Sequence, residues 1–402
     1  YMKKYMRVLV LALIMAFVLC ITANAMYIYV KIPPNRGSSV SVNSSDSIAT
    51  AKGKIQKSTG IPKEQQVLFY QGNLLEDDST LASYNIVNNY SEVYLWHPAH
   101  DGQGMVKWEA NDRLPDTAGT YYLDTDVTIT GTWNVPEGTT TLCLNGHVIT
   151  MADNAPGSVI SIGEGATLNI CDCHSEDCSN EDCYCTHYFE APCSDGETPA
   201  AGLWELTTET ATEATDKIIV PVKGGVITGG KVTDGSGGAV SCSGKFNLIR
   251  GSIVGNQAED YGGGVYNNGT FTMYGGSIMG NGAANGGGVS SKKSFLMAAG
   301  NIKCNSADSA GGGVENSDQF TMYGGSIEGN SASGGGGVFN TAGTFTLSGG
   351  EISANSAADG GGVYNNGTFT MGGGSIGVNQ VTDNGCGVYN NQTFTMNGGE
   401  IS

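Results

Sequence analysis

Positively charged side chains are scarce in this sequence. The 402 residues include 19 lysines and arginines against 38 aspartates and glutamates, and beyond residue 150 the sole arginine is Arg250. Charged residues make up 14% of the chain, against about 25% in an average globular protein. An acidic surface with few arginines repels nucleic acid and anionic membranes. We therefore expect no nucleic-acid partner.

Long hydrophobic runs are also lacking, with one exception near the N-terminus. Basic residues at positions 3–7 precede the apolar run VLVLALIMAFVLCI, and residues 23–25 read Ala-Asn-Ala. The run is shorter than the about 20 residues that span a membrane, and the small-residue triplet is typical of a cleavage site. Residues 1–25 are therefore predicted to be a signal peptide. The protein is expected to be secreted or at the cell surface, without membrane insertion after cleavage.

Residues 26–97 carry the signals of a small mixed domain. MYIYVKI alternates as a strand, SVSVN is its hairpin partner, and Ser45 and Asp46 stand where a helix N-cap belongs, before SIATAKGKIQKSTG. Gly60 is expected to end that helix. QQVLFYQGNLLEDDSTLASYNI and a last strand at VYLW complete the set. The region resembles ubiquitin over its whole length, which implies a β-grasp fold.

The same resemblance implies a binding face but not conjugation. The recognition patch of the family corresponds to Pro33, Phe69 and Trp96, which makes a ubiquitin-binding protein a possible partner. The alternative is that this patch packs on the next domain. The last strand continues into HPAHDGQGMVKW, where the family has its C-terminal double glycine. Residues 98–107 are predicted to be a linker.

Glycine-rich repeats fill the second half of the sequence. They follow the pattern GGGVYNNGTFTMYGGSIMGN with a step of 24 or 25 residues. Such a repeat buries its valine, phenylalanine and isoleucine only when successive coils stack at about 4.8 Å. The sequence therefore predicts a mainly β protein, with a right-handed parallel β-helix over residues 108–402. An asparagine ladder is expected at one corner, formed by Asn256, Asn281, Asn305, Asn330, Asn355 and Asn379.

The repeats resemble the glycine-rich repeats of bacterial surface proteins and adhesins of the pectin-lyase-like architecture. This implies an adhesive or structural role, with a surface glycan or a protein as ligand. Aromatic residues that follow the repeat valine point outward and could stack on that ligand or on one another. They are Tyr266, Phe339, Tyr364 and Tyr389. The chain stops inside a repeat, so a truncated C-terminus, with an anchor or domain missing, is expected.

Candidate catalytic groups do not converge in the repeats. The lyases and hydrolases of this architecture need grouped carboxylates or a basic residue, whereas Glu315, Glu328 and Glu351 fall in different columns or on non-adjacent coils. We expect no catalytic residue, no cofactor and no enzymatic activity. The first alternative is a polysaccharide lyase or hydrolase whose site lies in a missing part. The second is a secreted ubiquitin mimic that binds host proteins.

Six of the 11 cysteines crowd into an insertion at about residues 171–204, which is predicted to interrupt the coils as a loop. In an exported chain disulfides are the default, with 15 possible pairings, and Cys143 could also pair into the loop. A zinc site made with His174 and His187 is the weaker alternative. The remaining Cys242, Cys304 and Cys386 are expected to be small buried residues. The disulfide or zinc candidates are Cys171, Cys173, Cys178, Cys183, Cys185 and Cys193.

Overall fold

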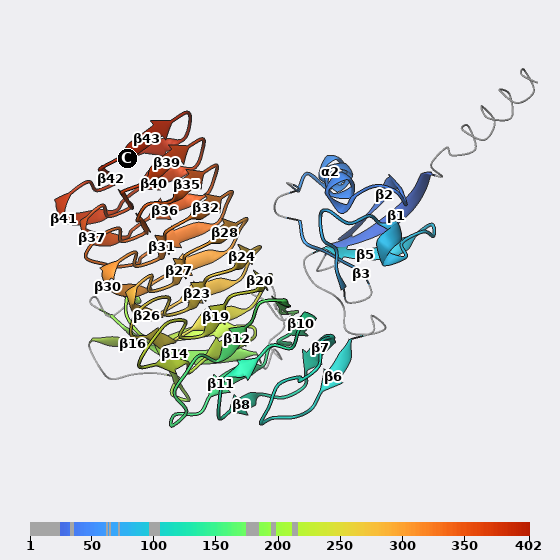
Figure 1. Ribbon diagram of the computed structural model, residues 1–402, viewed down its shortest axis with the longest axis horizontal. Helices are drawn as coiled ribbons and strands as arrows, with labels where there is room; N and C mark the ends of the chain where they lie inside the picture. The colour runs from blue at the N-terminus through green and yellow to red at the C-terminus, as the bar shows by residue number, and fades with distance from the viewer. Residues whose placement is uncertain are drawn as a thin grey trace, which may run out of the picture. The chain divides into compact units, whose positions relative to one another are not determined.

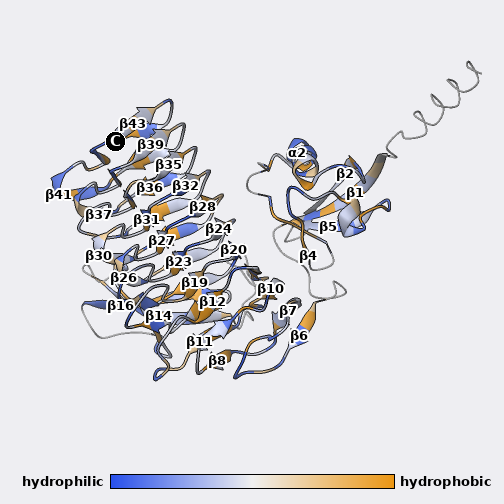
Figure 2. Cartoon of the chain, viewed as in Figure 1, coloured by the Kyte–Doolittle hydropathy of each residue, from blue (hydrophilic) through white to orange (hydrophobic). Residues whose placement is uncertain are grey.

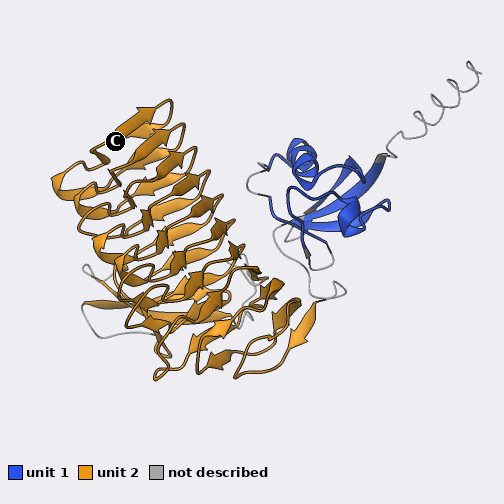
Figure 3. Ribbon diagram, viewed as in Figure 1, with its two compact units in different colours: residues 1–70, 74–96 blue, residues 71–73, 97–402 orange. Residues whose placement is uncertain are grey.

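The computed structural model describes residues 25–32, 36–61, 63, 66–70, 73–95, 105–173, 185–193, 198–210 and 216–402. The chain divides into two compact units, one of residues 1–70 and 74–96 and one of residues 71–73 and 97–402 (Figure 3). The predicted signal peptide up to residue 24, Pro33, Trp96, Cys178 and Cys183 lie outside the described residues. Within the described residues, no helix is long and apolar enough to cross a membrane.

The first unit is a five-stranded sheet with one α-helix, ordered β2-β1-β5-β3-β4. Strands β1 and β2 form the antiparallel hairpin, β1 pairs in parallel with β5, and α2 packs its buried residues Ile48, Ala51 and Ile55 into the core of this sheet. The predicted β-grasp arrangement is confirmed. Its elements are β1 (Ala25–Ile32), β2 (Arg36–Asn43), α2 (Ile48–Thr59), β3 (Leu68–Tyr70), β4 (Asn73–Leu74), the 3-10 helix η2 (Ala82–Tyr84) and β5 (Ser91–Leu95).

The caps of α2 agree with the sequence at one end and differ at the other. Gly60 ends the helix in the left-handed region, with φ of 79°, and its N–H donates to the Gln56 carbonyl, as predicted. The N-cap is Ser47, whose Oγ accepts from the Thr50 N–H at 3.2 Å, and not Ser45 or Asp46. Asp46 instead accepts from the Asn43 N–H and pairs with Lys54. Its carboxylate therefore fixes the turn that precedes the helix.

The second unit is a parallel β-solenoid built from three long sheets (Figure 1). The phenylalanine sheet has 11 strands, the isoleucine sheet 10 and the valine sheet 9, each named for its repeated core residue. The first strand, β6, begins at Val106, so the solenoid starts inside the predicted linker. The predicted parallel coils are confirmed, including the early coils of residues 108–170.

The strands of the phenylalanine sheet are β6 (Val106–Trp108), β7 (Thr120–Leu123), β10 (Gly138–Cys143), β13 (Ala166–Cys171), β20 (Lys245–Leu248), β24 (Thr270–Met273), β28 (Ser294–Met297), β32 (Gln319–Met322), β35 (Thr344–Leu347), β39 (Thr368–Met371) and β43 (Thr393–Met396). Those of the isoleucine sheet are β8 (Val127–Ile129), β11 (Val148–Met151), β17 (Val226–Thr228), β21 (Ser252–Val254), β25 (Ser277–Met279), β29 (Asn301–Lys303), β33 (Ser326–Glu328), β36 (Glu351–Ser353), β40 (Ser375–Gly377) and β44 (Glu400–Ile401).

The strands of the valine sheet are β9 (Trp133–Asn134), β12 (Ile160–Ile162), β19 (Val240–Cys242), β23 (Val265–Asn267), β27 (Val289–Ser291), β31 (Val314–Asn316), β34 (Val338–Asn340), β38 (Val363–Asn365) and β42 (Val388–Asn390). Further strands form two small sheets: β18 (Lys231–Val232), β22 (Gln257–Ala258), β26 (Gly282–Asn285) and β30 (Ser306–Ala310) in one, β37 (Ser356–Asp359) and β41 (Gln380–Asn384) in the other.

Identical side chains stack from coil to coil inside the solenoid, and hydrophobic positions recur along it (Figure 2). Because strands pair without a register shift, Phe295 lies directly between Phe271 and Phe320, with ring centroids 4.8 and 4.7 Å away. The spacing is that of adjacent β-strands. The rings therefore stack without displacing the backbone hydrogen bonds that join the coils.

Two asparagine ladders run from coil to coil along the solenoid. In the predicted ladder, the Nδ2 of every asparagine from Asn256 to Asn355 donates to the Oδ1 of the asparagine one coil on at 2.9–3.0 Å. A second ladder, two residues after the repeat valine, runs through Asn316, Asn340, Asn365 and Asn390 at 2.7–2.8 Å. The sequence analysis missed it, although an even offset from a buried valine marks an inward position.

The cysteine-rich insertion is a folded layer and not merely a loop. Its described part forms an antiparallel sheet of β14 (Thr186–Pro192), β15 (Glu205–Thr207) and β16 (Lys217–Lys223). The segment KIIVPVK, expected to resume the coils, is β16, and the coils resume with β17. Phe189 and Trp204 pack over Val254 and Met279, which are both buried.

Trp204 fixes this layer to the solenoid. Its backbone N–H donates to the Gly280 carbonyl at 2.9 Å, and a Cβ at Gly280 would lie 2.2 Å from the indole ring. Gly280 also has φ of 60°, so only glycine allows both the turn and the indole contact. The insertion therefore shares a hydrophobic core with the coils it covers.

Candidate functional site

Three of the four predicted outward aromatic residues form a continuous row on the valine sheet. The centroid of Tyr364 lies 4.6 Å from that of Phe339 and 4.7 Å from that of Tyr389. All three side chains are half-buried. Tyr266 stands apart, because Ser290 and Glu315 occupy the column between it and Phe339. We refer to Phe339, Tyr364 and Tyr389 as the aromatic row.

Stacking within the aromatic row limits what the row can bind. Neighbouring rings occupy both faces of Tyr364, so this side chain presents its edge and its hydroxyl group, which accepts from Asn391 Nδ2 at 3.0 Å. A sugar ring would need an open aromatic face. The row is therefore better suited to edge contacts and hydrogen bonds with a protein surface.

Glu315 is a buried charge in the same column. Its Oε2 accepts from Lys292 Nζ at 2.8 Å and from Ser290 Oγ at 2.7 Å, and its Oε1 accepts from Ser317 and Thr341. The glutamate is 4% exposed. Burial alone raises the pKa of Glu315, but hydrogen bonds led by that from Lys292 outweigh burial, and the pKa is lowered. The carboxylate thus joins neighbouring coils through its hydrogen bonds. Because it is buried and both of its oxygen atoms accept hydrogen bonds, it is unsuited to acid–base catalysis.

We predict that Glu315 makes the solenoid sensitive to acid. A group whose pKa is depressed on folding stabilises the fold above its ordinary pKa of 4.5, and this contribution is lost as the pH falls through the lowered value. The melting temperature should therefore drop less between pH 5 and pH 3 in Glu315→Gln than in the wild type. Glu400→Gln, at an exposed position, is the control. Parallel pH profiles for wild type and Glu315→Gln would contradict the prediction.

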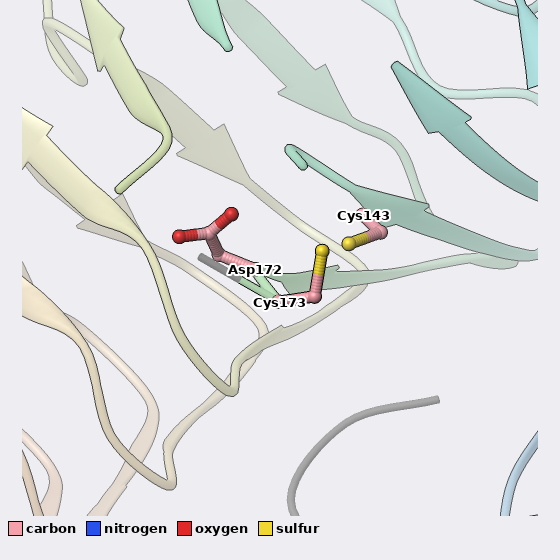
Figure 4. Close-up of side chains that lie close together, drawn as sticks. All are labelled: Cys143, Asp172 and Cys173. Atoms are coloured by element: carbon pink, nitrogen blue, oxygen red, sulfur yellow. The ribbon is translucent and has the colours of Figure 1, made fainter. Parts of the chain in front are cut away.

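A cluster of cysteines lies where the insertion leaves the solenoid. Cys143 at the end of β10 pairs in register with Cys171 at the end of β13. The sulfur atoms of Cys143 and Cys173 face each other (Figure 4). One donor atom from each of Cys143, Asp172 and Cys173 lies within 4.8 Å of the others. Burial raises the pKa of Cys171 well above its ordinary value.

The other candidate cysteines lie apart from this cluster. Cys185 directly precedes β14, and Cys193 directly follows it. The backbone of Cys193 forms an isolated antiparallel β-bridge with that of Pro199. Cys171 and Cys173 carry thiols. Since Cys178 and Cys183 lie outside the described residues, the disulfide pairing and the six-cysteine zinc alternative stay predictions. Among the remaining cysteines, Cys242 and Cys304 are buried as expected, whereas Cys386 is exposed.

Two histidines border the cysteine cluster. His187 Nε2 lies 2.9 Å from the Gly146 carbonyl oxygen, and His147 Nδ1 lies 3.0 Å from Asp126 Oδ1. The bond with His147 lowers the pKa of Asp126. Asp126 also accepts from the Val148 N–H. Both histidines therefore tie strand ends together at this corner.

The predicted recognition patch of the first unit is not open at its one described residue. Phe69 in β3 is fully buried and pairs with Tyr94 of β5, itself 8% exposed. Among the described residues of this unit, the exposed aromatic side chains are Tyr27, Tyr29 and Tyr90, and the rings of Tyr27 and Tyr90 stack with centroids 6.3 Å apart.

Comparison with known proteins agrees with the fold of the first unit. The ubiquitin family matches residues 28–95. Residues 28–95 form a ubiquitin-family domain. Ubiquitin-like protein 4B of Mus musculus is 36% identical over 76 residues, covering 19% of this chain and 40% of that protein. The Homo sapiens protein of the same name is 33% identical over 91 residues, covering 21% and 52%. The chain thus spans about half the length of these relatives or less, and the matches concern the ubiquitin-family domain.

Proposed function

We propose that the protein is an exported cell-surface protein with an adhesive or structural role. In this proposal the solenoid is the scaffold, and the ubiquitin-family domain is an N-terminal head that is not conjugated. The observation that carries the proposal is the unbroken in-register stacking of the three long sheets, with the aromatic row on the valine sheet. Such stacks give a stable array on which repeated side chains present an extended surface.

The ligand that best suits this surface is a protein. The ring faces of the aromatic row are largely covered by one another, which leaves edges and hydroxyl groups. Polar neighbours such as Asn366 and Asn391, joined at 3.0 Å, lie beside the row and supply further hydrogen-bonding groups. Half-buried aromatic residues with polar surroundings are typical of protein interfaces.

The ubiquitin-family domain is proposed to act as a stable folded module that is not conjugated to other proteins. Strand β5 ends at Leu95 and the chain continues through the solenoid, so the domain lacks the free C-terminus that conjugation uses. The burial of Phe69 speaks against a host-binding mimic. The Glu315 carboxylate accepts hydrogen bonds from four side chains, those of Lys292, Ser290, Ser317 and Thr341. It is therefore one carboxylate fewer for a lyase or hydrolase to use.

A binding assay on cells of the source organism tests the adhesive role. We expect the purified chain to bind these cells saturably and Tyr364→Ala to bind about tenfold more weakly, since it removes the central ring of the row. Tyr323→Ala is the matched control, because Tyr323 is an exposed tyrosine of the solenoid outside the row. Equal binding by both variants and the wild type would refute the role of the row.

A further inference from the structure

We propose that Cys143, Asp172 and Cys173 form a binding site for a thiophilic divalent metal ion of the zinc class. This site differs from a cluster within the insertion, because Cys143 belongs to a solenoid strand and lies 30 positions from Cys173. It is independent of the proposed adhesive role. The argument rests on the donor set, on its preorganisation and on its burial.

The donor atoms suit zinc. Zinc takes thiolate sulfur at about 2.3 Å and carboxylate oxygen at about 2.0–2.2 Å in tetrahedral sites. Two sulfur atoms on one tetrahedral zinc ion lie about 3.8 Å apart. The sulfur atoms of Cys143 and Cys173 and an oxygen of Asp172 already lie within 4.8 Å of one another. Closing around an ion therefore requires movements of about an ångström.

The carboxylate is held in place by two backbone N–H groups, one from the preceding coil and one from its own. Asp172 Oδ1 accepts from the Gly146 N–H at 2.8 Å, and Oδ2 accepts from the Gly225 N–H at 2.9 Å. These bonds fix the orientation of the carboxylate, and a carboxylate oxygen has two lone pairs with which to accept hydrogen bonds or bind an ion. Hydrogen bonds that orient a ligand in this way are a regular feature of metal sites.

Asn145 lies beside the cluster and could supply the fourth ligand of a tetrahedral ion. Its Oδ1 lies 3.1 Å from Cys173 Sγ, and its Nδ2 donates to the Leu123 carbonyl at 2.8 Å, which fixes the direction of the amide. The asparagine has φ of 51°, a region in which asparagine is favoured among non-glycine residues. The fourth position of a tetrahedral ion is thereby left to the Asn145 amide oxygen or to a water molecule.

Burial sets the strength of the site and its structural effect. Cys143 is fully buried and Asp172 is 1% exposed, whereas Cys173 is half-exposed and gives the ion a route of entry. When the ion binds, the two thiols release their protons to solvent, and the resulting thiolates and the carboxylate hold the divalent cation strongly at low dielectric. A bound ion would join β10 to the segment where the insertion begins, in addition to the hydrogen bonds of Asp172.

The test uses the purified, reduced full-length chain, with Zn²⁺ in competition with a chromophoric chelator and Co²⁺ as a spectroscopic probe. We expect one ion whose binding is weakened about 100-fold in both Cys143→Ser and Cys173→Ser. The Co²⁺ complex should show thiolate charge-transfer absorption that both variants lose. Cys242→Ser is the matched control, because Cys242 is an equally buried cysteine on another coil. Circular dichroism and melting of each variant establish that it folds.

A separate variant tests whether the cysteines outside the described residues bind the ion instead. A Cys178→Ser, Cys183→Ser double variant should keep the wild-type affinity. Zinc binding that survives Cys143→Ser, or that only this double variant loses, would overturn the proposal. A reduced wild-type chain that binds no zinc, or a Cys143–Cys173 disulfide that persists in place of the metal, would overturn it as well.

Discussion

Phe320→Ala is expected to lower the free energy of unfolding by about 3–5 kcal/mol. Phe320 is fully buried, and its ring stacks between those of Phe295 and Phe345 at 4.7 and 4.8 Å. Truncation removes both contacts and leaves a cavity that the hydrogen-bonded coils cannot close, because a coil cannot move inward without breaking its pairing with both neighbours. Chemical denaturation followed by far-ultraviolet circular dichroism measures the loss.

The matched control for this prediction is Phe394→Ala. Phe394 occupies the same column on β43, but its ring is half-exposed and contacts one phenylalanine, Phe369, at 4.8 Å. Its truncation should cost less than half as much. Equal losses for the two variants would mean that the stack does not stabilise the coils cooperatively.

Asn305→Asp is expected to destabilise the solenoid by more than about 3 kcal/mol at pH 7. Asn305 Nδ2 donates to the Ile278 carbonyl and to Asn330 Oδ1, both at 3.0 Å. An aspartate cannot donate to either oxygen, and its charge would be buried against them, at a cost of about 1–3 kcal/mol for each polar group left unsatisfied and more for the charge. Thermal melting at pH 7 measures the loss.

Two comparisons isolate the role of the ladder. Asn397→Asp, an exposed asparagine on the loop after β43, should leave the melting temperature nearly unchanged. Asn305→Asp should regain stability as the pH falls and the new carboxyl group takes up a proton, since the neutral acid can donate one hydrogen bond. A variant as stable as the wild type at pH 7 would show that the ladder is not needed.

The sequence predicts the solenoid well because its repeats fix every buried column. A step of 24 or 25 residues places Phe271, Phe295 and Phe320 in register, and period-2 alternation then decides which neighbours point inward. The first asparagine ladder follows from the same columns. The ubiquitin-family domain is equally predictable, because its strand, helix and cap signals run in family order.

The insertion could not be predicted in this way. Its antiparallel strands have no repeat, so nothing in the sequence shows that Phe189 and Trp204 cover Val254 and Met279. The metal candidate was missed for a related reason. Cys143 and Cys171 are paired in register, but they lie in early coils whose lengths differ from the repeat, which hides their alignment. The family patch maps to Phe69, but its burial follows from the packing of β3 and is not visible in the sequence.

The most direct test of the account is where the mature chain is found and where it begins. Cells of the source organism that express the protein can be treated with an impermeant protease, and the released or secreted chain sequenced from its N-terminus. The account predicts that the solenoid is reached from outside the cell and that the mature chain begins at Met26. A chain that stays inside the cell, protected from the protease and retaining residues 1–25, would contradict it.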